Sequence, residues 1–271
     1  NSLELNSHAF GTSGWNPFAA FIEPGQTVLV KPNLVRHRHM NGGPIESVVT
    51  HGSVIRCALE YIALALKGRG KIIVADAPVQ SADFDEIIAL QGLQSICRRV
   101  SKIWQVPVHL LDLRLSAVSL DEKHRVRNRS MLSGDPKGYH RINLSCDSYL
   151  HPIDAGYEKF RVTNYDCGSM QSHHNRTVHE YLIAGSVLEA DSIVNVAKLK
   201  THRKVGLTAS LKNLVGINGH KDWLPHHRQG SIPEGGDEYQ CPSALKRTLT
   251  CTSDAIDASP QSSLNALWRL S

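Results

Sequence analysis

A dense group of basic side chains lies between residues 196 and 227. The segment VAKLKTHRKVGLTASLKNLVGINGHKDWLPHH contains five lysines and four histidines among turn-forming glycines. Side chains alternate sides along a strand, so Lys198, Lys200 and His202 are expected to share one face. Crowding and partial burial would lower lysine and histidine pKa values, which suits a general base or a Schiff-base lysine. A solvated strand end that pairs with nearby acids is the alternative.

Other polar residues end or follow predicted buried strands. Lys31 and Asn33 belong to TVLVKPNLV, and Asp76 belongs to KIIVADAP. Ligands of open parallel sheets collect beyond the carboxyl ends of the strands, so these residues and KLKTH are expected to line one crevice. Lys31 would hold a carboxylate or phosphate, and Asp76 would orient a lysine or bind a metal. The alternatives are a lysine that reaches solvent, a turn asparagine and a capping aspartate.

The segment GLTASLKNLVG is predicted to form a short helix directly after the basic strand. Free N–H groups at the start of a helix attract anions, so the amides of Gly206, Leu207 and Thr208 are candidates for binding one. Lys212 and Asn213 would line the same pocket. An exposed helical lysine is the alternative for Lys212.

The segment from 217 to 240 is predicted to be a functional loop, because it has four glycines, two prolines and no period. Its candidate metal ligands are His220, His226, His227 and Asp237, with Asp222 and Glu238 nearby and His173 and His174 more distant in sequence. Imidazoles with carboxylates suit zinc, iron or manganese, but the spacing matches no established signature such as H-E-x-x-H. A polar lid without metal is the alternative.

Composition narrows the class of protein. The 271 residues are 41% hydrophobic and 20% charged, with 30 basic and 25 acidic side chains and a net charge of +5. This mild excess does not indicate a nucleic-acid partner and favours an anionic small molecule. Six cysteines form no C-x-x-C pair, so no iron–sulfur cluster or zinc ribbon is encoded; Cys57 and Cys97 are expected in the core. The sequence shows no leader and no apolar run of about 18 residues, so no membrane span is expected. A cytoplasmic location is therefore expected.

Strands and helices alternate along the chain. Strands are predicted at 27–35, 71–78, 107–114 and 191–199, and helices at 53–68 (with Gly68 as its cap), 84–104, 179–190 and 206–216. This order predicts an α/β fold, a mostly parallel Rossmann-like sheet with helices on both faces. Residues 115–160 would form a polar insertion, either a long excursion or a small β subdomain. The domain would cover 1–240, and 241–271 would be a tail with a helix around SALKRTLT.

Common α/β enzyme motifs are not found. The sequence contains no G-x-x-x-x-G-K-[ST] loop, no G-x-G-x-x-G after a strand and no G-x-S-x-G elbow. Nucleotide hydrolysis, ordinary dinucleotide binding and serine hydrolysis are therefore disfavoured.

Three segments resemble the domain-of-unknown-function 362 family: VLVKPNLV, IIVADAP and ADSIVNVAKLKTHRKVGLTASLKNLVGINGHKDWLPHHRQGS. The GHKDWLPHHRQGS loop looks like a branch found among bacterial polysaccharide-biosynthesis genes. Family members often carry a ferredoxin module and continue into a glycine-rich second half, so the tail is expected to begin such a half. The family is also similar in fold to the amino-terminal domain of nickel-pincer lactate racemases, where histidines and lysines serve a cofactor and proton or hydride transfer beside a carboxylate.

These observations favour an enzyme that acts on a carboxylate- or phosphate-bearing small molecule. His202, assisted by Lys200, would be the acid and base, and Lys212 would neutralise developing negative charge. Two alternatives stay open. One is a metal enzyme that uses the 217–240 loop, and the other is a non-catalytic binding or scaffold protein.

Overall fold

The computed structural model describes residues 4–122, 126–162, 167–202 and 206–257. The chain divides into two compact units, which are described separately below. Unit 1 comprises residues 1–120, 127–140 and 183–219, and unit 2 comprises residues 121–126, 141–182 and 220–271.

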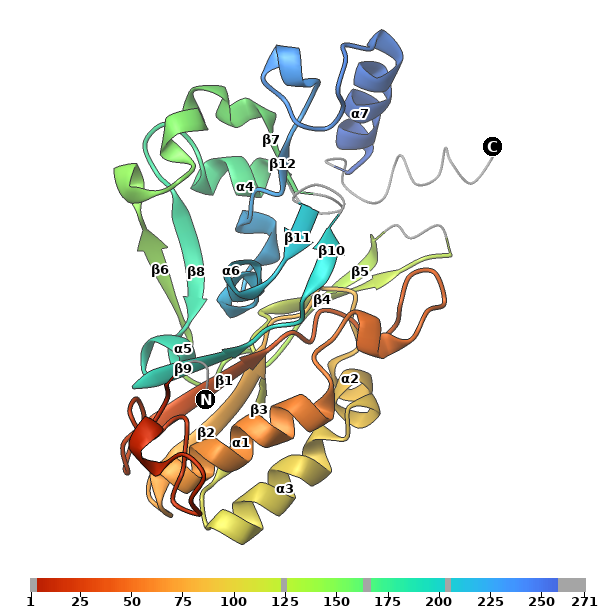
Figure 1. Ribbon diagram of the computed structural model, residues 1–271. Coiled ribbons are helices and arrows are strands. Elements are labelled where there is room, and N and C mark those ends of the chain that lie inside the picture. The colour runs from red at the N-terminus through yellow and green to blue at the C-terminus, as the bar shows by residue number, and fades with distance from the viewer. Residues whose placement is uncertain (1–3, 123–125, 163–166, 203–205, 258–271) are drawn as a thin grey trace. The chain divides into compact units, whose positions relative to one another are not determined.

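Unit 1 is built on a parallel four-stranded sheet (Figure 1). The strand order is β3 (Val108–Asp112), β2 (Lys71–Asp76), β1 (Thr27–Pro32) and β9 (Ser192–Val196). Strands β1 and β2 are short, buried runs rich in β-branched residues, which is typical of strands covered on both faces. The predicted α/β class, with parallel strands at these four places, is confirmed.

Three helices cover one face of this sheet. They are α1 (Gly52–Leu66), α2 (Phe84–Leu90) and α3 (Leu93–Trp104). Val28, Val30 and Val74 form the sheet side of this core, in which Ile55 and Leu59 of α1 are fully buried. Helix α1 ends at Leu66, and its left-handed cap is Lys67 (φ 51°), one residue before the predicted cap Gly68.

The segment 84–104, predicted as one helix, is two. Gly92 adopts a left-handed conformation (φ 62°) between α2 and α3, which a continuing α-helix cannot accommodate.

The opposite face of the sheet is covered differently from the expectation. Leu29, Ile73 and Ala75 pack there with Ala184 and Val187. The only helix these residues contribute is the four-residue α5 (Gly185–Leu188). Helices on both faces and a Rossmann-like arrangement are therefore not confirmed.

The helix predicted over 179–190 is wrong. Residues Glu180–Ala184 form strand β8, which pairs with β6 (Tyr139–Asn143), and only α5 follows as a helix. A short apolar run such as YLIA fits a strand as well as a helix, and here the partner strand decides. Gly185 ends the strand against Lys137, whose carbonyl oxygen would lie 2.5 Å from a Cβ at that position.

The polar insertion consists of short elements. Strands β4 (Ser116–Leu120) and β5 (Val126–Met131) form one two-stranded sheet, and β6 belongs to another. Two 3-10 helices follow, η3 (Ser145–Asp147) and η4 (His151–Lys159).

Unit 2 has a small core of its own around Phe160, Val162 and Met170. Strand β7 (Phe160–Arg161) pairs antiparallel with β12 (His227–Arg228) beside α4 (Cys167–His173). The predicted loop 217–240 is mostly irregular, with the 3-10 turns η6 (Lys221–Trp223) and η7 (Ile232–Glu234). The helix predicted in the tail is α7 (Ala244–Asp257). No helix in the described ranges is long and apolar enough to cross a membrane.

The cysteines differ in accessibility, which predicts their reactivity. Cys97 is buried, and burial raises the pKa of its thiol to about 11, whereas Cys57, predicted to be in the core, is exposed. Since the thiolate is the reactive form, we expect iodoacetamide at pH 8 to modify Cys57 and Cys146 and leave Cys97 intact in the folded protein. Peptide mass mapping measures this. Equal labelling of Cys97 and Cys57 would contradict the assigned burial.

Candidate functional site

A buried ion pair joins the carboxyl ends of β1 and β2. Lys31 Nζ lies 2.6 Å from Asp76 Oδ1, and the two side chains are 0% and 4% exposed. Lys31 also donates to the carbonyl oxygen of Pro32 (2.7 Å) and to Oδ1 of Asn213 (3.3 Å). An ammonium group has three hydrogens, so these three partners saturate it. Burial lowers the pKa of Lys31, and the Asp76 carboxylate opposes this shift.

Because all three N–H groups of Lys31 have partners, Lys31 cannot have the role predicted from the sequence. It was expected to hold a ligand anion, yet its ammonium is inaccessible and already neutralised by Asp76. Asp76 is also fully used, because its Oδ2 accepts a hydrogen bond from the Leu34 amide (2.6 Å). Asn33 is 8% exposed and donates to the Val48 carbonyl oxygen (2.6 Å). Lys31, Asp76 and Asn33 are therefore buried residues whose polar groups bind other parts of unit 1.

Asn213 fixes the helix that carries Lys212. Helix α6 (Ser210–Asn213) has only four residues, and Asn213 at its end is 6% exposed. Its Nδ2 donates to the Lys31 carbonyl oxygen (3.0 Å) and to Oδ1 of Asn195 in β9 (2.8 Å). Asn195 in turn donates to the Ser210 carbonyl oxygen (2.8 Å). Asn213, expected to bind substrate, thus anchors α6 to two strands.

Gly216 allows the chain after α6 to pass directly over the ion pair. A Cβ at this position would lie 2.0 Å from Asp76 Oδ1 and 2.6 Å from Lys31 Nζ. The Gly216 carbonyl oxygen accepts a hydrogen bond from the Ala77 amide (2.8 Å), which holds the backbone in contact with β2. No other residue type fits here without displacing the pair.

The basic strand end forms a hairpin arm. Strand β10 (Lys200–His202) pairs antiparallel with β11 (Gly206–Thr208), with His202 opposite Gly206. The amides of residues 206–208 were expected to begin a helix and bind an anion; they belong to a strand instead, so that prediction is wrong. Exposure alternates along the strand: Lys198, Lys200 and His202 are half-buried, while the residues between them are exposed.

The side chains of Lys212 and His202 are in contact through Nζ and Nε2. Two bases at this distance can be joined by one proton, which one nitrogen donates and the other accepts. Burial lowers the pKa of Lys212. A proton held in this way can be passed on to a bound group.

Lys200 lies in the same positive environment. It donates to the Val48 carbonyl oxygen (2.9 Å). Burial, and then the charge of Lys212, lower its pKa to about 8; Arg36 and Lys198 contribute, and Asp76 opposes the shift. Among the described residues no carboxylate forms an ion pair with Lys198, Lys200 or Lys212.

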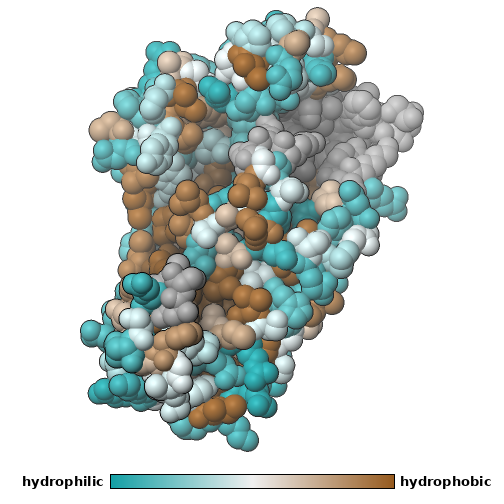
Figure 2. Space-filling view, in the orientation of Figure 1, coloured by the Kyte–Doolittle hydropathy of each residue, from teal (hydrophilic) through white to brown (hydrophobic). Residues whose placement is uncertain are grey.

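The outer side of the same segment is apolar. Leu199, Leu207 and Leu211 are 66%, 56% and 88% exposed. Figure 2 shows hydrophobic residues at the surface over β10, β11 and α6. The strand alternation therefore separates an apolar outer side from the half-buried basic side.

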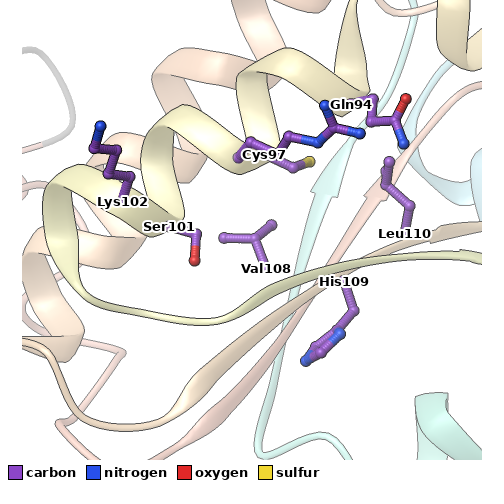
Figure 3. A pocket seen from close by; sticks show the side chains of 8 residues that line it. Gln94, Cys97, Ser101, Lys102, Val108, His109 and Leu110 are labelled. Carbon is purple, nitrogen blue, oxygen red and sulfur yellow. The ribbon is translucent and has the colours of Figure 1, made fainter.

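A hollow on unit 1 lies away from these residues. Figure 3 shows it between α3 and β3, with Val108 and Leu110 pointing toward the helix and His109 pointing away. Cys97 and Ser101 line its helical side. None of the predicted site residues belongs to its lining.

The predicted metal ligands of the 217–240 loop are used in separate interactions in unit 2. His227 Nε2 lies 3.2 Å from Glu238 Oε1, whereas Asp237 Oδ1 accepts from the Arg228 amide (3.0 Å). His220 Nδ1 lies 4.0 Å from Asp222 Oδ2. His226 meets His227 ring edge to ring face at 5.8 Å. Within the described ranges the structure does not bring His220, His226, His227 and Asp237 into one ligand group.

A different group in unit 2 could hold a metal ion. His151, Asp154 and His179 each offer one ligand atom, and these atoms lie within 4.8 Å of one another. His174, a more distant candidate metal ligand from the sequence, is 0% exposed beside His179. Burial, and then His179, lower the pKa of His174 to about 4, so its ring is neutral at pH 7.

Sequence reasoning missed Asn195, Gly216 and the group around His179. Asn195 sits in the middle of a predicted buried strand, where a polar residue needs a partner, and this was an available signal. His151 and Asp154 are three residues apart, which signals a shared face once the segment is known to be a 3-10 helix. Nothing local marks Gly216, because its neighbours come from two distant strands.

Comparison with known proteins gives one family. The family described as "Domain of unknown function (DUF362)" matches residues 28–126 and 153–264. No curated protein and no solved structure matches the chain.

Proposed function

The chain belongs to the DUF362 family, and from this premise we propose that unit 1 is an enzyme domain that binds a carboxylate- or phosphate-bearing small molecule. The basic cluster formed by Lys198, Lys200, His202 and Lys212 would be the binding site. The family's description names no activity, so the proposal is argued from the residues of this chain.

One observation carries the proposal, the excess of positive charge at the basic cluster. The acidic group that raises the pKa of Lys200 is Asp76, and Lys31 already neutralises it at 2.6 Å. Four basic groups thus share a half-buried region in which, among the described residues, the three lysines form no ion pair. Burial lowers the pKa of Lys200 most, and an anion would offset the further lowering by the charge of Lys212. The ligand should therefore carry a carboxylate or a phosphate.

The same cluster supports acid–base chemistry. His202 would accept or donate the proton at Nε2, the atom in contact with Lys212. Lys200, with a pKa of about 8, would serve as the assisting base. Lys212 would neutralise negative charge that develops on the substrate. Loss of turnover in both His202→Ala and Lys200→Ala, with folding retained, tests these roles; full turnover in both would exclude them.

The substrate class follows from the resemblance and is part of the proposal. The likeness of the GHKDWLPHHRQGS loop to a polysaccharide-gene branch favours a sugar-linked acid or sugar phosphate. A fold similarity to the lactate racemase amino-terminal domain, expected from the resemblance, would favour a reacting carbon next to a carboxylate. We also propose a reducing, cytoplasmic location, because all six cysteines are free thiols.

Anion affinity should decrease as pH rises through the pKa of Lys200. Lys200 carries its charge below about pH 8 and loses it above. Sulfate keeps a constant charge over this range, so we expect calorimetry to give sulfate a dissociation constant about 3- to 10-fold larger at pH 9 than at pH 7. Lys200→Met should weaken binding at pH 7 and flatten the profile.

Lys102→Met, which removes an exposed lysine of α3, is the matched control and should behave as the wild type. Equal sulfate affinity in Lys200→Met and the wild type would contradict the proposed site. A sugar phosphate and a sugar carboxylate that compete with sulfate would then rank the substrate classes. Binding without turnover of any such compound would favour the alternative of a non-catalytic binding protein.

A further inference from the structure

Two side chains of unit 2 lie together because of the 3-10 helix η4. Residues three apart are eclipsed in this helix type, so His151 and Asp154 lie on one side of it. His151 Nδ1 is 2.9 Å from Asp154 Oδ2. The His151 side chain is 50% exposed and the Asp154 side chain 12% exposed, so the pair lies at the edge of the buried region.

His179 reaches the same carboxylate from the interior. Its backbone is fixed on both sides, since its amide donates to Asn143 Oδ1 (3.0 Å) and its carbonyl oxygen accepts from the Leu144 amide (2.9 Å). His179 Nε2 lies 3.4 Å from Asp154 Oδ2. Ligand atoms around a tetrahedral zinc lie about 3.3–3.5 Å apart, which follows from bonds of about 2.0–2.1 Å, so this spacing suits a shared ion.

The ring nitrogen that faces Asp154 lacks a hydrogen bond. His179 is 1% exposed, and its Nε2 is buried with no hydrogen-bond partner in spite of the nearby carboxylate. Leaving a buried polar atom unsatisfied costs about 1–3 kcal/mol, so such an atom calls for an explanation. A metal ion between His179, Asp154 and His151 would use this lone pair.

The other ring nitrogen of His179 is held by a neighbouring histidine. His179 Nδ1 lies 3.4 Å from His174 Nδ1, within a fully buried pair of rings. Metal-binding histidines commonly donate their second N–H to such a partner, which fixes the tautomer and the ring plane. With Nδ1 engaged by His174, Nε2 is the atom free to bind a metal.

We propose that His151, Asp154 and His179 form a binding site for a divalent transition metal such as zinc, with a fourth coordination position on the solvent side of His151. Two imidazoles and one carboxylate favour zinc or a neighbouring transition metal over calcium and magnesium, which prefer oxygen ligands. The site is independent of the basic cluster of unit 1, and it uses none of the metal ligands predicted from the 217–240 loop.

Zinc titration of the full chain tests the proposal. Untagged protein, stripped with a chelator and then dialysed, is titrated with zinc against a chromogenic chelator that competes for it. We expect one site with a dissociation constant below about 1 µM. His179→Ala and Asp154→Asn should each weaken this site about 100-fold or more, because even outer partners of a ligand contribute 10- to 100-fold.

His151→Ala keeps the test decisive if the buried variants fail to fold. His151 is half exposed, so its removal should leave the fold intact while weakening zinc binding at least about 10-fold. His109→Ala, a histidine on the exposed side of β3, is the control and should bind as the wild type does. Unchanged zinc affinity in His151→Ala, or no site tighter than about 100 µM in the wild type, would overturn the proposal.

Discussion

Replacing Asp76 by asparagine is expected to lower the free energy of unfolding of unit 1 by about 3–5 kcal/mol, because it leaves a buried lysine without its counter-charge. Lys31 is 0% exposed and its closest partner is the Asp76 carboxylate at 2.6 Å. Asparagine retains the shape and one acceptor oxygen but removes the charge. Hydrogen–deuterium exchange of the β1 and β2 amides, measured in increasing urea, reports on this unit directly.

The effect of Asp76→Asn should depend on pH. Burial lowers the pKa of Lys31 in the folded protein, and the loss of Asp76 removes the group that opposes this shift. Because the pKa of Lys31 is lower in the folded than in the unfolded protein, folding at low pH must either release the Lys31 proton or bury an unpaired charge. The variant should therefore recover part of its lost stability as pH rises toward 10, because an uncharged lysine needs no counter-charge. A loss that is the same at pH 6 and pH 9 would contradict an electrostatic origin.

Two further variants distinguish the loss of the Lys31–Asp76 ion pair from an unspecific loss of stability. The double variant Lys31→Met with Asp76→Leu should be more stable than Asp76→Asn alone, since no unpaired charge remains. Glu60→Gln removes the partly exposed partner of Arg56 on α1 and should cost at most about 0.5 kcal/mol. If Asp76→Asn cost no more than Glu60→Gln, the pair would not be the centre of this unit.

Asp76→Asn should also affect the basic cluster. Asp76 raises the pKa of Lys200, against the larger lowering by burial and Lys212. Without that carboxylate, Lys200 should lose its proton at a lower pH. Asp76 therefore supports the fold of unit 1 and also influences the charge of Lys200, a candidate reacting residue.

The sequence alone was sufficient to predict the parallel sheet of unit 1 and the face shared by Lys198, Lys200 and His202. The runs at β1 and β2 are β-branched and bounded by turn residues, and the runs at β3 and β9 are short and apolar; such runs specify strands with little help from elsewhere. The alternation of Lys198, Lys200 and His202 depends only on the two-residue period of an extended chain. Both features are local, which is why they could be predicted.

Features decided by distant contacts could not be predicted in this way. YLIA became β8 because β6 pairs with it, and residues 206–208 became β11 because β10 does. Lys31 was expected to be available to a ligand, and only the positions of Asp76 and Asn213 reveal that its three hydrogens are used. His179 acquires its neighbours through a backbone position that no short-range pattern encodes.

The second large effect is expected at Gly216. Changing glycine to alanine in a conformation that alanine accepts usually stabilises a protein by about 0.4–1 kcal/mol, since it reduces the freedom of the unfolded chain. The backbone of Gly216 is not left-handed, so conformation alone would favour alanine. Its Cβ, however, would lie 2.0 Å from Asp76 Oδ1 and 2.6 Å from Lys31 Nζ, and both of these side chains are buried.

We therefore expect Gly216→Ala to destabilise unit 1 by about 3 kcal/mol or more, the upper end for overpacking, because the added methyl group must separate a buried ion pair. Urea-dependent hydrogen exchange of β1 and β2 measures the loss, and sulfate affinity should fall with it, because α6 and Lys212 directly precede this turn. Gly14→Ala is the control: its Cβ would meet only Thr12 Oγ1 at 3.7 Å, so it should be neutral or slightly stabilising. The sign of the change decides the matter. A stabilised Gly216→Ala would mean that the chain after α6 does not approach the ion pair as closely as described, and the anchoring of Lys212 beside His202 would lose its structural basis.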